Sequence, residues 1–151
     1  MNILSLDLGT TTGWAVRIRS GAIISGSAKF AQKKNINRAH KWRLFKQWLA
    51  LILAKYDIHA VYYEEVMNHS GARAAHCYGA FEAFVELACL SHGCIVTGVG
   101  VGTIKKFATG KGNAKKCDMV KAAELMGCWT IGHDEADAYC LLKYALSLEA
   151  D

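Results

Sequence analysis

The sequence predicts an α/β protein built on a five-stranded mixed sheet flanked by helices. Short β-branched runs between glycine turns at the start of the chain predict three antiparallel strands. Two later apolar runs are predicted strands joined by a long apolar helix, and such a strand–helix–strand unit makes the two strands parallel. Proline, low-complexity tracts and internal repeats are absent from the 151 residues, so residues 1–151 are expected to form a single domain.

The three antiparallel strands occupy the first thirty residues. Residues 2–8 are apolar and extended, residues 9–13 with sequence GTTTG are expected to turn, and residues 14–18 continue extended. A second turn at Ser20 and Gly21 leads into a third strand over residues 22–30.

Helices alternate with two more strands in the rest of the chain. Apolar residues three and four apart predict an amphipathic helix over 35–56 with a basic outer side. A strand over 59–66, a long apolar helix over about 70–91 and a strand over 94–99 follow. Small residues between Ala74 and Ala88 make that long helix the expected surface for a second subunit. A short helical turn at 103–107, a loop at 108–113 and helices over 114–126 and 133–148 complete the chain.

Charge is concentrated in two basic segments. The net charge is +5, and no acid lies between Leu8 and Tyr56, where ten lysines and arginines fall. A second cluster of lysines between Lys105 and Lys121 contains only Asp118 as a counter-charge. Such segments beside several acids indicate a polyanionic partner, although a solvated helix face is an ordinary alternative for the first segment.

Hydropathy and cysteine usage exclude other classes. No run of 18 uncharged apolar residues occurs and no basic segment precedes the apolar start, so neither a membrane span nor a secretory signal is predicted and a cytoplasmic location is expected. The six cysteines are irregularly spaced and are expected to be reduced core thiols. Cys89, His92 and Cys94 lack a fourth ligand, which disfavours a structural zinc site.

Acidic residues lie at the ends of three separate predicted elements. Asp7 ends the first strand, Glu64 ends the fourth, and Asp134 and Asp137 lie three apart on one face of the last helix. Ligands bind beyond the carboxyl ends of parallel strands, where converging carboxylates repel one another unless cations neutralise them. Mg²⁺, with Mn²⁺ able to substitute, suits such oxygens, and two ions together can promote phosphodiester hydrolysis.

Each acid also has an ordinary explanation. Asp7 could initiate a turn, Glu64 could face solvent, and Asp134 could be a helix N-cap. The joint pattern favours the metal site, because Asp7 interrupts a strand that is otherwise apolar and Asp137 shares a helix face with Leu141.

The segments ILSLDLGTTTGWAV, YEEV, GKGNAKK and DEADA, in that order, carry a family resemblance. The first resembles the opening strand and hairpin of the ribonuclease H-like superfamily, and the set is similar to the RuvC family of Holliday junction resolvases, nearer to its divergent phage members. The resemblance implies a homodimeric, Mg²⁺-dependent endonuclease that cuts four-way DNA junctions in a bacterial or phage-infected cytoplasm. It implies two metal ions held by Asp7, Glu64, Asp134 and Asp137, with Lys116 near the scissile phosphate. Together with the basic segments, it places DNA contacts at Lys33, Lys34, Arg38, Lys105, Lys106, Lys111 and Lys115.

Two residues differ from the family pattern, and the glutamate that acts with Asp7 has two candidates. Leu8 stands where bacterial members usually have proline, and Met67 where they have an aromatic wedge, which leaves cleavage preference open. Strand alternation allows only one of Glu64 and Glu65 to point with Asp7; Glu64 fills the family position, and Glu65 is the alternative.

Other functions share parts of the pattern. DLGTTTG also resembles the phosphate-binding hairpin of sugar kinases, Hsp70 chaperones and actin-like ATPases, but those proteins need two such lobes. A non-enzymatic DNA-binding module is disfavoured because unneutralised acids beside DNA weaken binding. A nuclease for other branched DNA, or for ribosomal RNA precursors, would share the metal chemistry.

Overall fold

The computed structural model describes residues 1–30, 33, 35–129 and 132–150. Its five strands are β1 (Ile3–Asp7), β2 (Thr11–Arg17), β3 (Ile23–Lys29), β4 (Ala60–Glu65) and β5 (Ile95–Gly100). Its helices are α1 (Ala39–Lys55), α2 (Ala72–His92), α3 (Val101–Thr109), α4 (Lys116–Leu125) and α5 (His133–Glu149).

The strands form one mixed sheet in the order β3-β2-β1-β4-β5. β1 pairs antiparallel with β2 and β2 with β3, whereas β1 pairs parallel with β4 and β4 with β5. This arrangement confirms the predicted class, with three antiparallel strands followed by two parallel ones. The parallel pairing of β1 with β4 brings the carboxyl ends of both strands to the same end of the sheet.

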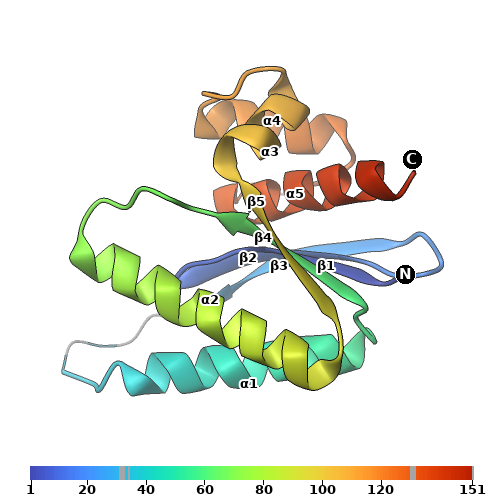
Figure 1. The fold of residues 1–151 in the computed structure, drawn as a ribbon. Helices are drawn as coiled ribbons and strands as arrows, with labels where there is room; N and C mark the ends of the chain where they lie inside the picture. The colour runs from blue at the N-terminus through green and yellow to red at the C-terminus, as the bar shows by residue number, and fades with distance from the viewer. Residues whose placement is uncertain (31–32, 34, 130–131, 151) are drawn as a thin grey trace.

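Helices cover both faces of the sheet. Figure 1 shows α1 and α2 against one face and α5 against the other, with α3 and α4 beyond α5. Leu4, Leu6 and Val61 point toward α1 and α2, where they pack with Phe45 and Phe81. On the other face, a second core joins Ile3 of β1 and Ala15 of β2 to α4 and α5. Alternate residues of β1 therefore serve different cores, as the pleat of a strand requires.

Several element boundaries differ from the sequence prediction, and three of the differences have a clear structural cause. β2 begins at Thr11 rather than at residue 14, because Gly13 already pairs with Asp7 and only residues 8–10 are left to turn. The Thr12 hydroxyl stabilises this turn by donating to the Gly9 carbonyl at 2.7 Å. α1 begins at Ala39 rather than at residue 35, since Asn35 has a positive φ of 74°, which a right-handed helix excludes.

The third difference concerns the connection after β5. The short helical turn predicted at 103–107 is part of a longer helix of nine residues, α3. It starts directly after the extended Gly100 and ends at Gly110, whose φ of 80° is the left-handed conformation that commonly terminates helices.

The cysteines are only partly the core residues that were expected. Cys89, Cys128 and Cys140 are buried, Cys77 and Cys94 are half-buried, and Cys117 is exposed on α4, contrary to prediction. Among the described residues, no helix has the length and apolar character needed to cross a membrane.

Candidate active site

Asp7 and Glu64 end adjacent parallel strands and belong to the same face of the sheet. Ser5 pairs with Tyr62 and Leu6 with Tyr63, so the next step of the register brings Asp7 beside Glu64. The Ser5 hydroxyl donates to the Ala138 carbonyl of α5 at 2.6 Å, which shows that this face of β1 looks toward α5. Asp7 lies two residues further along and therefore faces α5 as well.

The structure distinguishes Glu64 from Glu65. Glu64 is partly buried and lines a cavity that also contains Asp137. Glu65 is exposed, and its Cβ lies on the side of Gly98 that also contacts Tyr63, on the face opposite Glu64. Of the two glutamates, Glu64 is the one that can act with Asp7.

The amino-terminal end of α5 rests directly on β2 at Gly13. Gly13 is the cross-strand partner of Asp7. A Cβ atom at Gly13 would overlap the backbone carbonyl of Asp134 and lie 2.9 Å from the backbone nitrogen of Glu135. The side chain of Glu135 also accepts a hydrogen bond from Ser25 of β3 at 2.7 Å. These contacts bring the first turn of α5, and with it Asp134, close to Asp7.

Asp134 is not the helix N-cap that the ordinary explanation proposed. The N-cap of α5 is Gly132, with no side-chain capping bond, and Asp134 lies within the first turn. Asp137 follows one turn later, next to the buried Ala136 and Ala138.

A cavity of about 160 Å³ lies where these elements meet. β4 contributes Glu64, α5 contributes Asp137, α3 contributes Lys105 and α4 contributes Lys116. Val101, Ile104 and Met119 form its apolar wall. Two acids and two lysines from four different elements therefore share one small cleft.

The carboxyl groups disfavour one another's charge. Burial, followed by repulsion from Glu64, Asp137 and Asp134, raises the pKa of Asp7 well above its ordinary value. Burial and then Asp137 raise the pKa of Glu64 to about 7, with Lys105 opposing.

Asp137 shows the same behaviour. Burial and then Asp134 raise its pKa to about 6, although Lys105, His133 and Lys116 oppose the rise. Lysines therefore reduce the cost of the clustered negative charge without cancelling it, and a cation would be favoured here.

Oxygen donors of this kind fit a hard divalent cation. Carboxylates are the ligands that Mg²⁺ and Mn²⁺ prefer, and clustered acids with raised pKa values gain most from a cation. Over the described ranges, however, no group of three His, Cys, Asp or Glu side chains is arranged to hold an ion. The donor set suits the metal, and metal binding belongs to the proposals below.

Five more predicted DNA contacts fall among the described residues, and they lie around the same end of the sheet. Lys106 is exposed on α3, and Lys111 and Lys115 are exposed in and after the connection to α4. Lys33 and Arg38 are exposed in the segment after β3, which leaves the sheet at the Asp7 end because Lys29 pairs with Thr11. Lys34 lies outside the described residues.

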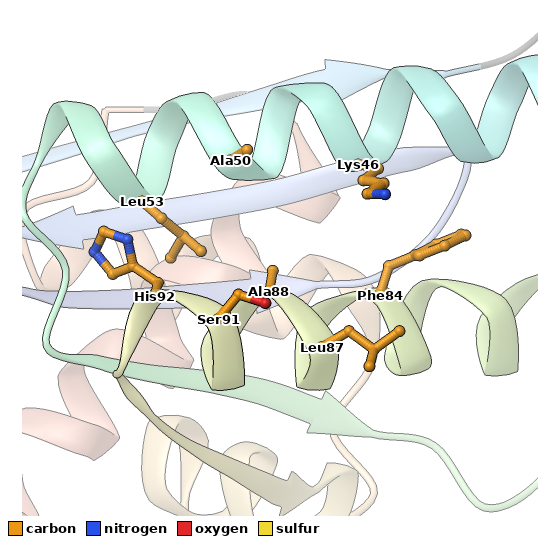
Figure 2. Close-up of a pocket in the computed structure, with 8 residues that line it drawn as sticks. All are labelled: Lys46, Ala50, Leu53, Phe84, Leu87, Ala88, Ser91 and His92. Carbon is orange, nitrogen blue, oxygen red and sulfur yellow. The ribbon is translucent and has the colours of Figure 1, made fainter.

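A larger cavity lies elsewhere and has a different character. A groove of about 500 Å³ runs between α1 and α2, and Figure 2 shows the side chains of both helices that line it. Its lining is mainly apolar, with Leu53, Phe84 and Leu87 between Lys46 and His92, and it contains no carboxylate. This groove lies on the face of the sheet opposite Asp7 and Glu64.

Comparison with known proteins identifies the fold. No protein-family model matches the sequence, and neither does any curated protein. Among solved structures, RuvC from Thermus thermophilus superposes with a TM-score of 0.80 at 19% identity, over 99% of this chain and 96% of that one. The fold is that of the RuvC resolvases. The structure of T. thermophilus RuvC in complex with a Holliday junction substrate superposes on this chain with a TM-score of 0.83, also at 19% identity and with the same coverage.

A yeast protein has the same RuvC-like fold. The yeast mitochondrial Holliday junction resolvase Ydc2 matches with a TM-score of 0.69 at 10% identity, over 98% of this chain and 78% of that one. These likenesses confirm the ribonuclease H-like architecture that the family resemblance implies.

Two residues important to the geometry are absent from the sequence prediction. The sequence predicts a turn at Gly13, yet this residue lies in β2 and is the contact point of α5. A glycine next to an extended segment is the available signal, because it commonly marks the close approach of another backbone. Tyr78 is one of three aromatic residues on α2 with Phe81 and Phe84, and its hydroxyl binds the end of β4. No sequence period reveals a contact of this kind.

Proposed function

We propose that this protein is a metal-dependent, structure-selective endonuclease that cuts four-way DNA junctions by paired symmetric nicks. The observation that carries the proposal is the convergence of Asp7, Glu64, Asp134 and Asp137, from three elements, beside Lys105 and Lys116. The RuvC-like fold supports it, because one of the matching structures is a RuvC bound to a Holliday junction substrate. We take residues 1–151 to act as one nuclease domain, in the cytoplasm of a bacterium or a phage-infected host, during DNA recombination and repair.

The four carboxylates would hold two Mg²⁺ ions. Ions bound there would activate the attacking water and stabilise the 3′ oxygen that leaves the phosphorus. Lys116 projects into the same cleft as Glu64 and Asp137, where an ammonium group can neutralise charge on the scissile phosphate. The backbone contact at Gly13 keeps the α5 carboxylates in register with the strand carboxylates.

Exposed cations would guide the DNA backbone to this cleft. Lys106, Lys111 and Lys115 surround the connection between α3 and α4, and Lys33 and Arg38 follow β3 at the same end of the sheet. Lysine and arginine contacts to phosphates give affinity without sequence preference. Binding is therefore expected to depend strongly on salt.

We also propose that the protein works as a homodimer through α2. Gly79, Ala83, Leu87 and Leu90 are all exposed, and their spacing of three and four places them along one side of the helix. Leu90 is 81% exposed and Leu87 is 59% exposed. Paired nicks in strands of like polarity need two equivalent sites related by a twofold axis, which a second copy would supply.

One observation favours a broader substrate range. Met67 is 79% exposed in the segment after β4, where the resemblance would place an aromatic wedge. Methionine offers no flat stacking platform for a base, so forks and other branched DNA, or structured RNA, are the second candidate substrates.

A substrate panel tests the proposal. Synthetic four-way junctions, forks and linear duplexes are incubated with the protein in Mg²⁺ and separated on denaturing gels. We expect paired nicks in the junction, slower cutting of the fork and no cutting of the duplex. Equal cutting of all three would reduce the protein to a general nuclease, and no cutting of any would refute the proposed function.

A further inference from the structure

A tyrosine hydroxyl from α2 binds the end of β4, the strand that carries Glu64, which is also paired with β5 as far as Glu65 and Gly100. The Tyr78 hydroxyl donates to the Glu64 carbonyl at 2.9 Å and accepts from the Val66 N–H at 3.1 Å. Tyr78 is only 9% exposed, so water does not readily replace these bonds. The pairing of β4 with β1 ends at Leu6 and Tyr63, and the hydroxyl supplies backbone hydrogen bonds beyond this last pair.

The same side chain holds the segment that follows β4. The ring of His69 lies 4.9 Å from the ring of Tyr78, measured between centroids. The exposed Met67 is therefore bracketed by two Tyr78 contacts, one at Val66 and one at His69. The end of β4 and the segment that follows it therefore both contact α2 through Tyr78.

The protonation state of Tyr78 allows its hydroxyl to donate and accept these hydrogen bonds at the same time. Burial raises its pKa to about 12, so the hydroxyl remains neutral and keeps its proton at physiological pH. Glu82 lies 3.3 Å from the hydroxyl and is a competing acceptor for that one proton. Glu82 also accepts a hydrogen bond from Tyr63, but a carboxylate can accept from both tyrosines. The shorter distance, 2.9 Å against 3.3 Å, favours the Glu64 carbonyl as the acceptor of the Tyr78 proton.

We infer that Tyr78 is a positioning residue for the nuclease centre, which holds the end of β4 so that Glu64 stays directed into the cleft with Asp137. This inference rests on the proposed function. Tyr78 itself touches neither the cleft nor its lysines, since the lining residues come from β4, α3, α4 and α5. Loss of its hydroxyl should therefore act through Glu64, on metal binding and turnover rather than on DNA affinity.

The test compares Tyr78→Phe with Tyr63→Phe. Both variants lose a tyrosine hydroxyl that bonds Glu82, but only the first loses bonds to the β4 backbone. For each variant, kcat and KM are measured on a four-way junction, with the Mg²⁺ concentration that gives half the maximal rate. Hydrogen exchange at the Val66 amide is followed by NMR without DNA or metal.

We expect Tyr78→Phe to lower kcat or raise the Mg²⁺ requirement by roughly 10-fold, the lower end of the range for groups that orient metal ligands. KM for the junction should stay within about twofold, and the Val66 amide should exchange faster; Tyr63→Phe should change none of these. Equal effects of the two variants on turnover would overturn the positioning role. Unchanged Val66 exchange in Tyr78→Phe would overturn it while nuclease activity stands, whereas a wild-type protein that cuts nothing would refute both the proposed function and the inference.

Discussion

Replacing Gly13 with alanine should disable the centre without touching a carboxylate. The added Cβ would overlap the Asp134 carbonyl and approach the Glu135 nitrogen to 2.9 Å. Both obstacles are backbone atoms, so no side-chain rotation can relieve them. Either β2 or the first turn of α5 must move, and Asp134 then moves away from Asp7, the cross-strand partner of Gly13.

The expected magnitude follows from packing and from reaction geometry. Overpacking of a filled site costs about 1–3 kcal/mol. For a chain of this size, each kcal/mol lowers Tm by roughly 2–4 °C. A displacement on the order of 1 Å at a reacting centre can cost about 100-fold in rate. Gly13→Ala should therefore lower Tm by several degrees and slow nicking by about two orders of magnitude.

The assay is single-turnover nicking of a four-way junction, well below the Tm of both proteins, with circular dichroism as the check on folding. Gly71→Ala is the matched control, because a Cβ there meets no atom within 4 Å and the extended backbone of Gly71, with a φ of 168°, accepts an alanine. That change should alter the free energy of unfolding by less than about 0.5 kcal/mol. A Gly13→Ala protein with wild-type Tm and wild-type nicking would refute the placement of α5 on β2.

Three further outcomes follow from the site. Glu64→Gln should abolish junction cutting in Mg²⁺ while Glu65→Gln retains it, because only Glu64 lines the cleft; equal losses on denaturing gels would contradict the assignment. In metal-free protein, Glu64 and Asp137 have pKa values of about 7 and 6, above those of the unfolded chain, so the folded state binds more protons. The free energy of unfolding should then fall as pH rises from about 4 to about 7, and Mg²⁺ should restore it at pH 7; denaturant titrations with no pH slope would oppose this. Lys106→Ala should flatten the slope of log affinity against log salt by about 1 in a junction-binding assay, and an unchanged slope would remove Lys106 from the DNA contacts.

The order of elements was predictable because most have a local signal. Short apolar runs between glycine turns marked the first strands, apolar residues three and four apart marked α1, and a long apolar run marked α2. Boundaries were predicted less well where long-range contacts decide them. Thr11 belongs to β2 because it pairs with Lys29 of β3, a contact that cannot be read from the sequence GTTTG.

The grouping of the four acids was predictable from strand order and helix spacing, but its details were not. Parallel pairing of β1 with β4 places Asp7 beside Glu64, and a spacing of three places Asp134 and Asp137 on one side of α5. The first turn of α5 can contact the sheet because Gly13 has no side chain. Tyr78 binds the end of β4 from α2, a helix on the other face of the sheet. Both are contacts between distant segments, which depend on the packed structure rather than on any local pattern.

The occupancy of the carboxylate cluster by metal is the most direct test of the proposed mechanism. Crystals grown with Mn²⁺ and measured at the manganese absorption edge would locate each ion by its anomalous scattering. We expect two Mn²⁺ ions among Asp7, Glu64, Asp134 and Asp137 in the wild-type protein and a loss of occupancy in Asp7→Asn. A wild-type crystal at saturating Mn²⁺ with no anomalous peak at these carboxylates would contradict a two-metal nuclease.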